Sequence, residues 1–136
     1  MGVIRFLSVQ DVPGIHASAI EVEGGLDGLR DLGLLESAVM MPQQQFGGRF
    51  LHESIFAMAA AYLFHIASNH PFNDGNKRAG AMAAYVFLDV NGHELTVDED
   101  DFERTVLAVA SGRMGKEALI EWFGKHVRQA GRRKRK

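Results

Sequence analysis

A nine-residue stretch near the middle of the chain gathers side chains that could do chemistry together: His70-Pro71-Phe72-Asn73-Asp74-Gly75-Asn76-Lys77-Arg78. An imidazole such as that of His70 can take a proton from a hydroxyl group near neutral pH. Asp74 supplies one carboxylate, and Mg²⁺ in nucleotide sites is commonly held by a carboxylate or two together with phosphate oxygens. These residue types predict a site that handles a magnesium-bound nucleotide phosphate.

The turn that follows Asp74 should open a helix, and the start of a helix attracts anions. If the helix begins at Asn76, directly after Gly75, its first backbone N–H groups point outward with the positive end of the helix dipole. Lys77 and Arg78 then fall in the first turn, where a cation is disfavoured by about 0.3–1 kcal/mol. A bound phosphate would remove this conflict, because Arg can grip it through two hydrogen bonds and Lys as a point charge.

Each of these residues also has a common structural explanation. A histidine before a proline often forms hydrogen bonds at a helix end, Asp-Gly is a frequent turn, and adjacent Lys and Arg side chains usually lie in solvent. The functional interpretation is favoured because all of them occur within nine residues and because the two cations conflict with the helix dipole.

Two alanine-rich apolar segments must hold this stretch between them. The spacing of apolar residues predicts a helix over residues 53–69, which has to end near His70 because Pro71 disfavours helical geometry in the residue before it. A second helix should run from Asn76 until Asn91-Gly92 supplies a left-handed end. The predicted site is therefore the connection between two core helices.

The remaining patterns predict further helices, a flap and an extended segment. The expected helices cover residues 9–23, 31–41, 98–110 and 116–129, the extended segment 93–97, and a β-hairpin flap 43–50 around Gly47-Gly48. In the first helix, Val9, Val12, Ile15, Ile20 and Val22 should form the apolar face. The fold class is thus mainly α: a compact single domain of about six helices with a small β-hairpin flap.

Composition limits the classes of protein to which the chain can belong. With 136 residues, of which 46% are hydrophobic, it can form one domain with a substantial core. The absence of cysteine excludes disulfides and thiolate zinc sites and favours the cytoplasm. The start shows no secretory signal, and the longest uncharged apolar runs are about half as long as a membrane span, so we expect a soluble protein that has no membrane partner.

The charge of the chain is unevenly distributed. The net charge is −2, and the five basic residues at 132–136 leave −7 on the remainder. We expect residues 1–131 to form the domain and residues 132–136 to be a disordered tail. The tail could bind nucleic acid, but an acidic body argues against a nucleic-acid-binding domain such as a repressor.

The stretch HPFNDGNKR resembles the His-x-Phe-x-Asp-Gly/Ala-Asn-Lys-Arg signature of the Doc (death-on-curing) toxins, which belong to the Fic/Doc superfamily. The similarity covers most of residues 20–97 and implies a compact Fic/Doc-type helical bundle. It also implies one role for each residue of the motif: His70 as the catalytic base, Asp74 as the Mg²⁺ ligand, Gly75 and Asn76 as part of the anion hole, and Lys77 and Arg78 as catalytic holders of the nucleotide phosphates. Phe72 would anchor the loop in the core, and the flap would align a target segment by strand addition.

Lys77 bears on the reaction, because Fic adenylyltransferases usually have Gly at this place and Doc-type enzymes have Lys. The resemblance therefore implies transfer of the γ-phosphate of ATP, the co-substrate, to a protein hydroxyl, with elongation factor Tu as the family's target. Transfer of AMP is the alternative reaction. A catalytically silent Fic-like binding module is the second alternative.

Fic proteins that inhibit themselves carry a [ST]xxxE[GN] motif, and the nearest segment here, Ala19 to Gly24, has Ala in place of Ser or Thr. We therefore interpret Glu23 as an exposed charge at a helix end. Without a recognisable internal inhibitor, the resemblance implies restraint by an antitoxin of the Phd type, whose disordered tail folds on binding.

Overall fold

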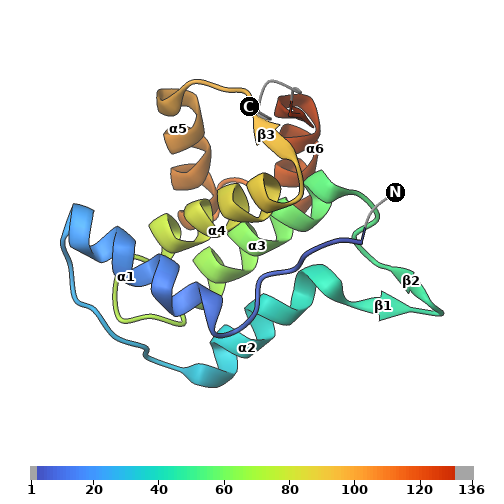
Figure 1. Cartoon of the computed structure of the whole chain (residues 1–136). Helices are drawn as coiled ribbons and strands as arrows, with labels where there is room; N and C mark the ends of the chain where they lie inside the picture. Colours follow the sequence, from blue (N-terminus) through green and yellow to red (C-terminus); the bar gives the residue numbers. More distant parts are fainter. Residues whose placement is uncertain (1–2, 131–136) are drawn as a thin grey trace, which may run out of the picture.

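The computed structural model describes residues 3–130, which form six α-helices and two small antiparallel ladders (Figure 1). The helices are α1 (Asp11–Glu23), α2 (Leu32–Met40), α3 (Ile55–Asn69), α4 (Asn76–Val90), α5 (Glu99–Ala110) and α6 (Lys116–His126). A 3₁₀ turn, η1 (Met41–Gln43), follows α2, and the strands are β1 (Gln45–Phe46), β2 (Arg49–Phe50), β3 (His93–Leu95) and β4 (Val127–Gln129). The predicted mainly α fold with a hairpin flap is confirmed, while the predicted tail at 132–136 lies outside the described residues.

Helices α3 and α4 form the centre of the core, and small side chains let them approach each other closely. The fully buried residues of α3 include Met58, Tyr62, Leu63 and Ile66. On α4, a methyl group built at Gly80 would lie only 3.0 Å from the backbone oxygen of Leu63, so that glycine is needed for this spacing. Because both helices are fixed by packing, the six residues that connect them are held at both ends.

Helix α1 and the connection between α1 and α2 lie beside the loop that joins α3 to α4 (Figure 1). Two buried side chains of α1, Val12 and Ala19, face the core. Val22, which was predicted to share this apolar face, is 83% exposed, so that prediction is wrong. The last turn of α1 contributes no apolar contact at this position and instead leads into the connection, residues 24–31.

Three predicted helix boundaries differ from the structure by two residues or more. Helix α1 begins at Asp11 rather than residue 9, because Ser8 and Asp11 exchange side-chain-to-backbone hydrogen bonds of 2.8 and 3.2 Å there. Helix α3 begins two residues later than predicted, because the hydroxyl of Ser54 caps it by accepting from the N–H of Ala57. The last helix ends at His126, and residues 127–129 form β4, which pairs antiparallel with β3.

The predicted flap is a two-stranded hairpin in which Gly47 and Gly48 adopt φ values of 62° and 81°. Figure 1 shows it beside the N-terminal end of α3, whereas the motif follows the C-terminal end of that helix. Helix α3 has 15 residues and is therefore about 22 Å long, and the flap and the motif lie toward its opposite ends. Strand addition at the flap stays a prediction. Among the described residues, no helix is long and apolar enough to cross a membrane.

Candidate active site

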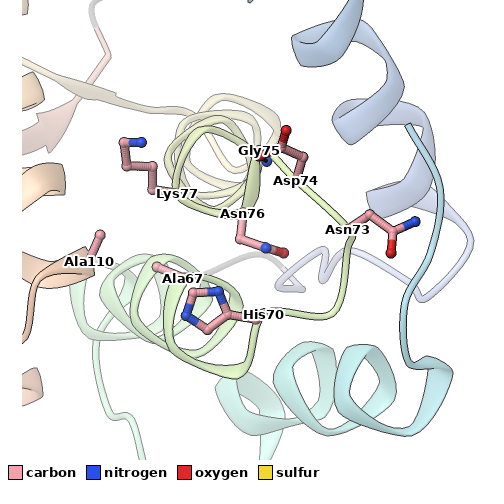
Figure 2. Close-up of a pocket in the computed structure, with 8 residues that line it drawn as sticks. All are labelled: Ala67, His70, Asn73, Asp74, Gly75, Asn76, Lys77 and Ala110. Atoms are coloured by element: carbon pink, nitrogen blue, oxygen red, sulfur yellow. Dashed lines mark hydrogen bonds between the residues drawn. The ribbon is translucent and has the colours of Figure 1, made fainter. Parts of the chain in front are cut away.

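A pocket of about 240 Å³ opens between the end of α3 and the start of α4. Its lining contains five of the six predicted site residues, together with two alanines and Asn73: Ala67, His70, Asn73, Asp74, Gly75, Asn76, Lys77 and Ala110. Figure 2 shows His70 across from the first turn of α4, with Lys77 and Asp74 on opposite sides of that turn. Arg78 is the predicted site residue that does not line the pocket.

His70 ends α3 in a left-handed backbone conformation, with φ 54° and ψ 55°. Within residues 3–130 it is the one non-glycine residue with positive φ, and such a conformation costs on the order of 1–2 kcal/mol. Arg30 offsets this strain, because its Nε donates to the carbonyl oxygen of His70 at 2.8 Å and its second nitrogen donates to that of Asn69 at 3.2 Å. The exposed imidazole is thereby aimed at the pocket from a fixed backbone.

The carboxylate of Asp74 is exposed and accepts two backbone hydrogen bonds. Leu26 N–H donates to Oδ2 and Gly75 N–H to Oδ1, both at 3.2 Å. A side chain at Gly25 would lie 3.0 Å from Oδ2, so the connection passes close to the carboxylate because of this glycine. Since each oxygen keeps further lone pairs, a hard cation such as Mg²⁺ fits this donor.

Within residues 3–130, Asp74 is the one carboxylate in the lining of the pocket. The described residues contain no cluster of three or more His, Cys, Asp or Glu side chains that could hold a metal. Mg²⁺ in phosphate-transfer sites is usually bound by a carboxylate or two plus phosphate oxygens and water, so Asp74 is the residue that would hold it here.

Helix α4 begins without a capping side chain among the described residues, after Gly75 in a left-handed conformation at φ 72°. The amide of Asn76 is buried and held within the loop, because its Oδ1 accepts from Phe72 N–H and its Nδ2 donates to Phe72 C=O. The backbone N–H of Asn76 belongs to the first turn of α4. The predicted anion hole would consist of the first N–H groups of α4.

The two cations of the motif lie in different surroundings. Lys77 is exposed and lines the pocket, whereas the guanidinium of Arg78 lies 3.0 Å from the carboxylate of Glu23 at the end of α1. Both members of this pair are nearly half exposed, so the pair is weak and can exchange for another anion. Glu23 is exposed, as predicted, but it also contacts the motif.

The connection holds the motif loop through backbone hydrogen bonds. The N–H groups of Arg30 and Asp31 both donate to the carbonyl of Pro71, and that of Asn73 donates to Gly28. Leu29 and Phe72 thus form an isolated antiparallel bridge. The loop between α3 and α4 is consequently fixed along its length by a segment about 40 residues earlier in the chain.

Sequence reasoning missed His16, which lies beneath the loop. Its side chain is 1% exposed, its ring stacks on that of Phe72, and its Nε2 lies 2.7 Å from the carbonyl oxygen of Asp74. The available signal was its position four residues after Val12 and three before Ala19, on the buried face of α1. A histidine in such an apolar face needs a polar partner, and here the motif loop supplies it.

A second group of titratable side chains, His52, His65 and Lys116, lies outside the pocket. Burial lowers the pKa of His52, and burial together with the charge of Lys116 lowers the pKa of His65 to about 4. Burial also lowers the pKa of Lys116. One ring nitrogen of each histidine is buried without a hydrogen-bond partner among the described residues.

The chain is similar to known proteins over most of its length. Residues 6–88 match the model of the Fic/DOC family. The chain is 40% identical over 96 residues to "Toxin Doc" of Mycolicibacterium smegmatis, which covers 71% of this chain and 72% of that protein. It is 29% identical over 121 residues to "Protein kinase doc" of Escherichia phage P1, covering 87% and 92% of the two chains.

The chain therefore belongs to the Fic/DOC family. Within this family, both relatives described here are Doc proteins, and the sequence-based assignment to the Doc toxins is confirmed. The family and the relatives support a transferase of the Fic/Doc superfamily.

Proposed function

We propose that this protein is a Doc-type toxin that transfers the γ-phosphate of ATP to a hydroxyl side chain of another protein, with elongation factor Tu as the first candidate target. The observation that carries the proposal is the shared pocket of His70, Asp74 and Lys77 at the uncapped start of α4. The relative from phage P1 is named a protein kinase, which supports the same reaction.

In the proposed reaction, the oxygen of the target hydroxyl forms a bond to the γ-phosphorus, and the bond between that phosphorus and the bridging oxygen of ADP breaks. ADP leaves with the electron pair of the broken bond, and the proton of the hydroxyl passes to the imidazole of His70. The left-handed backbone of His70 and the Arg30 hydrogen bonds hold that imidazole at the pocket.

The charges of the motif would stabilise the phosphates while the group is transferred. Lys77 and the first N–H groups of α4 face the pocket, and Arg78 can join them when it leaves Glu23. Asp74 would hold Mg²⁺, which when bound neutralises phosphate charge. A pocket of 240 Å³ is smaller than the roughly 300–1,000 Å³ of most small-molecule sites, so it suits the phosphates rather than the whole nucleotide.

Transfer of AMP is the competing reaction for the same set of residues. A phosphotransferase places the γ-phosphate next to the catalytic base, His70, whereas an adenylyltransferase places the α-phosphate there. The two can be separated by supplying elongation factor Tu, Mg²⁺ and ATP labelled on either the γ- or the α-phosphate. We expect label in the protein from the γ-position only; label from the α-position would replace the kinase with an adenylyltransferase.

We further propose that an antitoxin of the Phd type restrains the protein, because its relative from M. smegmatis is named a toxin. A disordered antitoxin segment that folds on binding could cover the open pocket. Expression of the chain alone should arrest bacterial growth, and co-expression with a cognate antitoxin should restore it. Arrest that persists with the antitoxin bound would contradict this part of the proposal.

A further inference from the structure

His16 reaches the motif loop from α1, 58 residues earlier in the chain. Its ring lies parallel to that of Phe72, with centroids 3.8 Å apart and planes 5° from parallel. Its Nε2 lies 2.7 Å from the carbonyl oxygen of Asp74. Since a carbonyl oxygen can only accept, Nε2 carries the proton and donates it to this bond.

The other ring nitrogen faces a carboxylate. Nδ1 of His16 lies 3.6 Å from Oδ1 of Asp27, and the same oxygen accepts from the N–H of Gly28 at 2.8 Å. The ring is therefore held by the stack on one face and by the hydrogen bond of Nε2, while Asp27 is a nearby charge beyond hydrogen-bond distance.

The bond from His16 acts on the peptide group that joins the carboxylate residue to the anion hole. The carbonyl of Asp74 and the N–H of Gly75 belong to one planar unit, so fixing the oxygen also fixes the N–H. Helix α1 packs directly under this unit: a methyl group at Gly75 would lie 3.1 Å from Ile20 and 3.5 Å from Nε2 of His16. The position of α1 thus determines the orientation of the peptide group that follows Asp74.

We propose that His16 is a positioning residue: its hydrogen bond to the Asp74 carbonyl fixes the peptide group whose Gly75 N–H donates to Asp74 Oδ1, and so orients this carboxylate for a magnesium-bound phosphate. This inference rests on the proposed function for its ligand. The effect of His16 on the geometry of the loop is independent of the proposed function and can be measured in the free protein. His16 touches no substrate and acts through Asp74.

Two substitutions separate the hydrogen bond from the ring stack. His16→Phe keeps an aromatic ring against Phe72 but removes the donor, whereas His16→Gln keeps an N–H donor and removes the ring. His52→Phe is the matched control, because His52 is also a buried histidine and does not line the pocket. Asp27→Ala tests the support of the ring at an exposed residue whose loss leaves the core intact.

The measured quantity is the Mg²⁺ concentration at which ATP binding is half-maximal. Calorimetry on the intact protein detects the binding. His16→Phe should raise this concentration about tenfold or more, as loss of an outer partner does at other metal sites. His16→Gln and His52→Phe should stay close to wild type, and Asp27→Ala should show a smaller rise than His16→Phe. Thermal unfolding of each variant confirms that it is folded.

Two results would overturn the proposal: a folded His16→Phe that binds like the wild type, or a His16→Gln that is as impaired as His16→Phe. If His16→Phe does not fold, a folded His16→Gln whose half-saturating Mg²⁺ concentration is about tenfold above wild type would overturn it. If the wild type itself shows no magnesium-dependent ATP binding, the proposed function has failed. The amide signal of Gly75 in NMR spectra then tests the role of His16. The proposal requires that this signal shift in His16→Phe and stay in place in His16→Gln.

Discussion

The motif loop and the group formed by His52, His65 and Lys116 both place histidines among apolar helices, yet they differ in how their polar atoms are satisfied. In the motif loop, His16, Arg30 and the backbone of the connection supply partners for nearly every polar group. In the second group, a ring nitrogen of each histidine is buried without a partner among the described residues, and burial lowers the pKa values.

The difference shows that the hydrogen-bond partners of a histidine, rather than the residue type alone, indicate whether it belongs to a functional site. The motif loop presents exposed charges on a backbone that is fixed from a distant segment, which is what a site that must orient phosphates requires. The second group carries a cost on acidification, because burial lowers the pKa of both histidines.

The largest effect is expected for Asp74→Asn. Loss of the charge that would hold Mg²⁺ should lower the rate of phosphate transfer at least about a hundredfold, because metal stabilisation of phosphate charge contributes several kcal/mol. Stability should hardly change, since asparagine keeps an acceptor for the N–H of Leu26. Transfer rates and urea unfolding check both statements, with Asp89→Asn on α4 as the control. Normal activity in Asp74→Asn would remove Asp74 from the site.

A moderate effect is expected for Arg30→Ala. The carbonyls of Asn69 and His70 would lose their charged donor, and the strained backbone of His70 would relax. We expect a loss of about 1 kcal/mol in the free energy of unfolding and a fall in transfer rate. Arg104→Ala on α5, which breaks an exposed pair with Asp101, should leave both unchanged. Equal effects of the two variants would contradict the role of Arg30.

The second group should reveal itself through pH. The pKa of His65 is about 4 in the folded protein, below the ordinary 6.5 of the unfolded chain. The unfolded state therefore binds the proton first, so the stability is complete above about pH 6.5 and is lost as the pH falls toward 4. The urea midpoint should be lower at pH 5 than at pH 7. His65→Gln should reduce this difference, and an identical pH dependence in that variant would disprove the assignment.

The smallest effect is expected for Glu23→Gln. It would free Arg78 from a half-exposed ion pair worth about 0.2–1 kcal/mol, which corresponds to roughly 1.5- to 5-fold tighter binding of ATP. Glu21→Gln on the same helix is the control, and binding can be followed by calorimetry. Weaker binding in Glu23→Gln would mean that Glu23 supports the site instead of competing with phosphate.

Much of the fold was predictable because its signals are local. Asp98 caps α5 and Gly92 follows the end of α4, as the residue types indicated. The candidate site was predictable for the same reason, since its members lie in one stretch of nine residues. By contrast, β4 was predicted as helix, because only its pairing with β3, about 30 residues earlier, makes it a strand.

The residues that hold the site could not be predicted from local patterns. His16, Glu23 and Arg30 reach the loop across 40 to 58 positions through the packing of α1 and the connection. Arg30 and Glu23 look like ordinary surface charges in the sequence. Their contacts depend on where α1 lies against α4, which no periodicity reports.

The most direct test of the account is the intact mass of elongation factor Tu after incubation with ATP, Mg²⁺ and either the wild type or His70→Ala. We predict a gain of one phosphoryl group with the wild type and a loss of that gain in His70→Ala, whose missing base should slow transfer by about 10²–10⁴-fold. A gain of one AMP would contradict the kinase. An equal phosphoryl gain with His70→Ala would contradict the role of the motif.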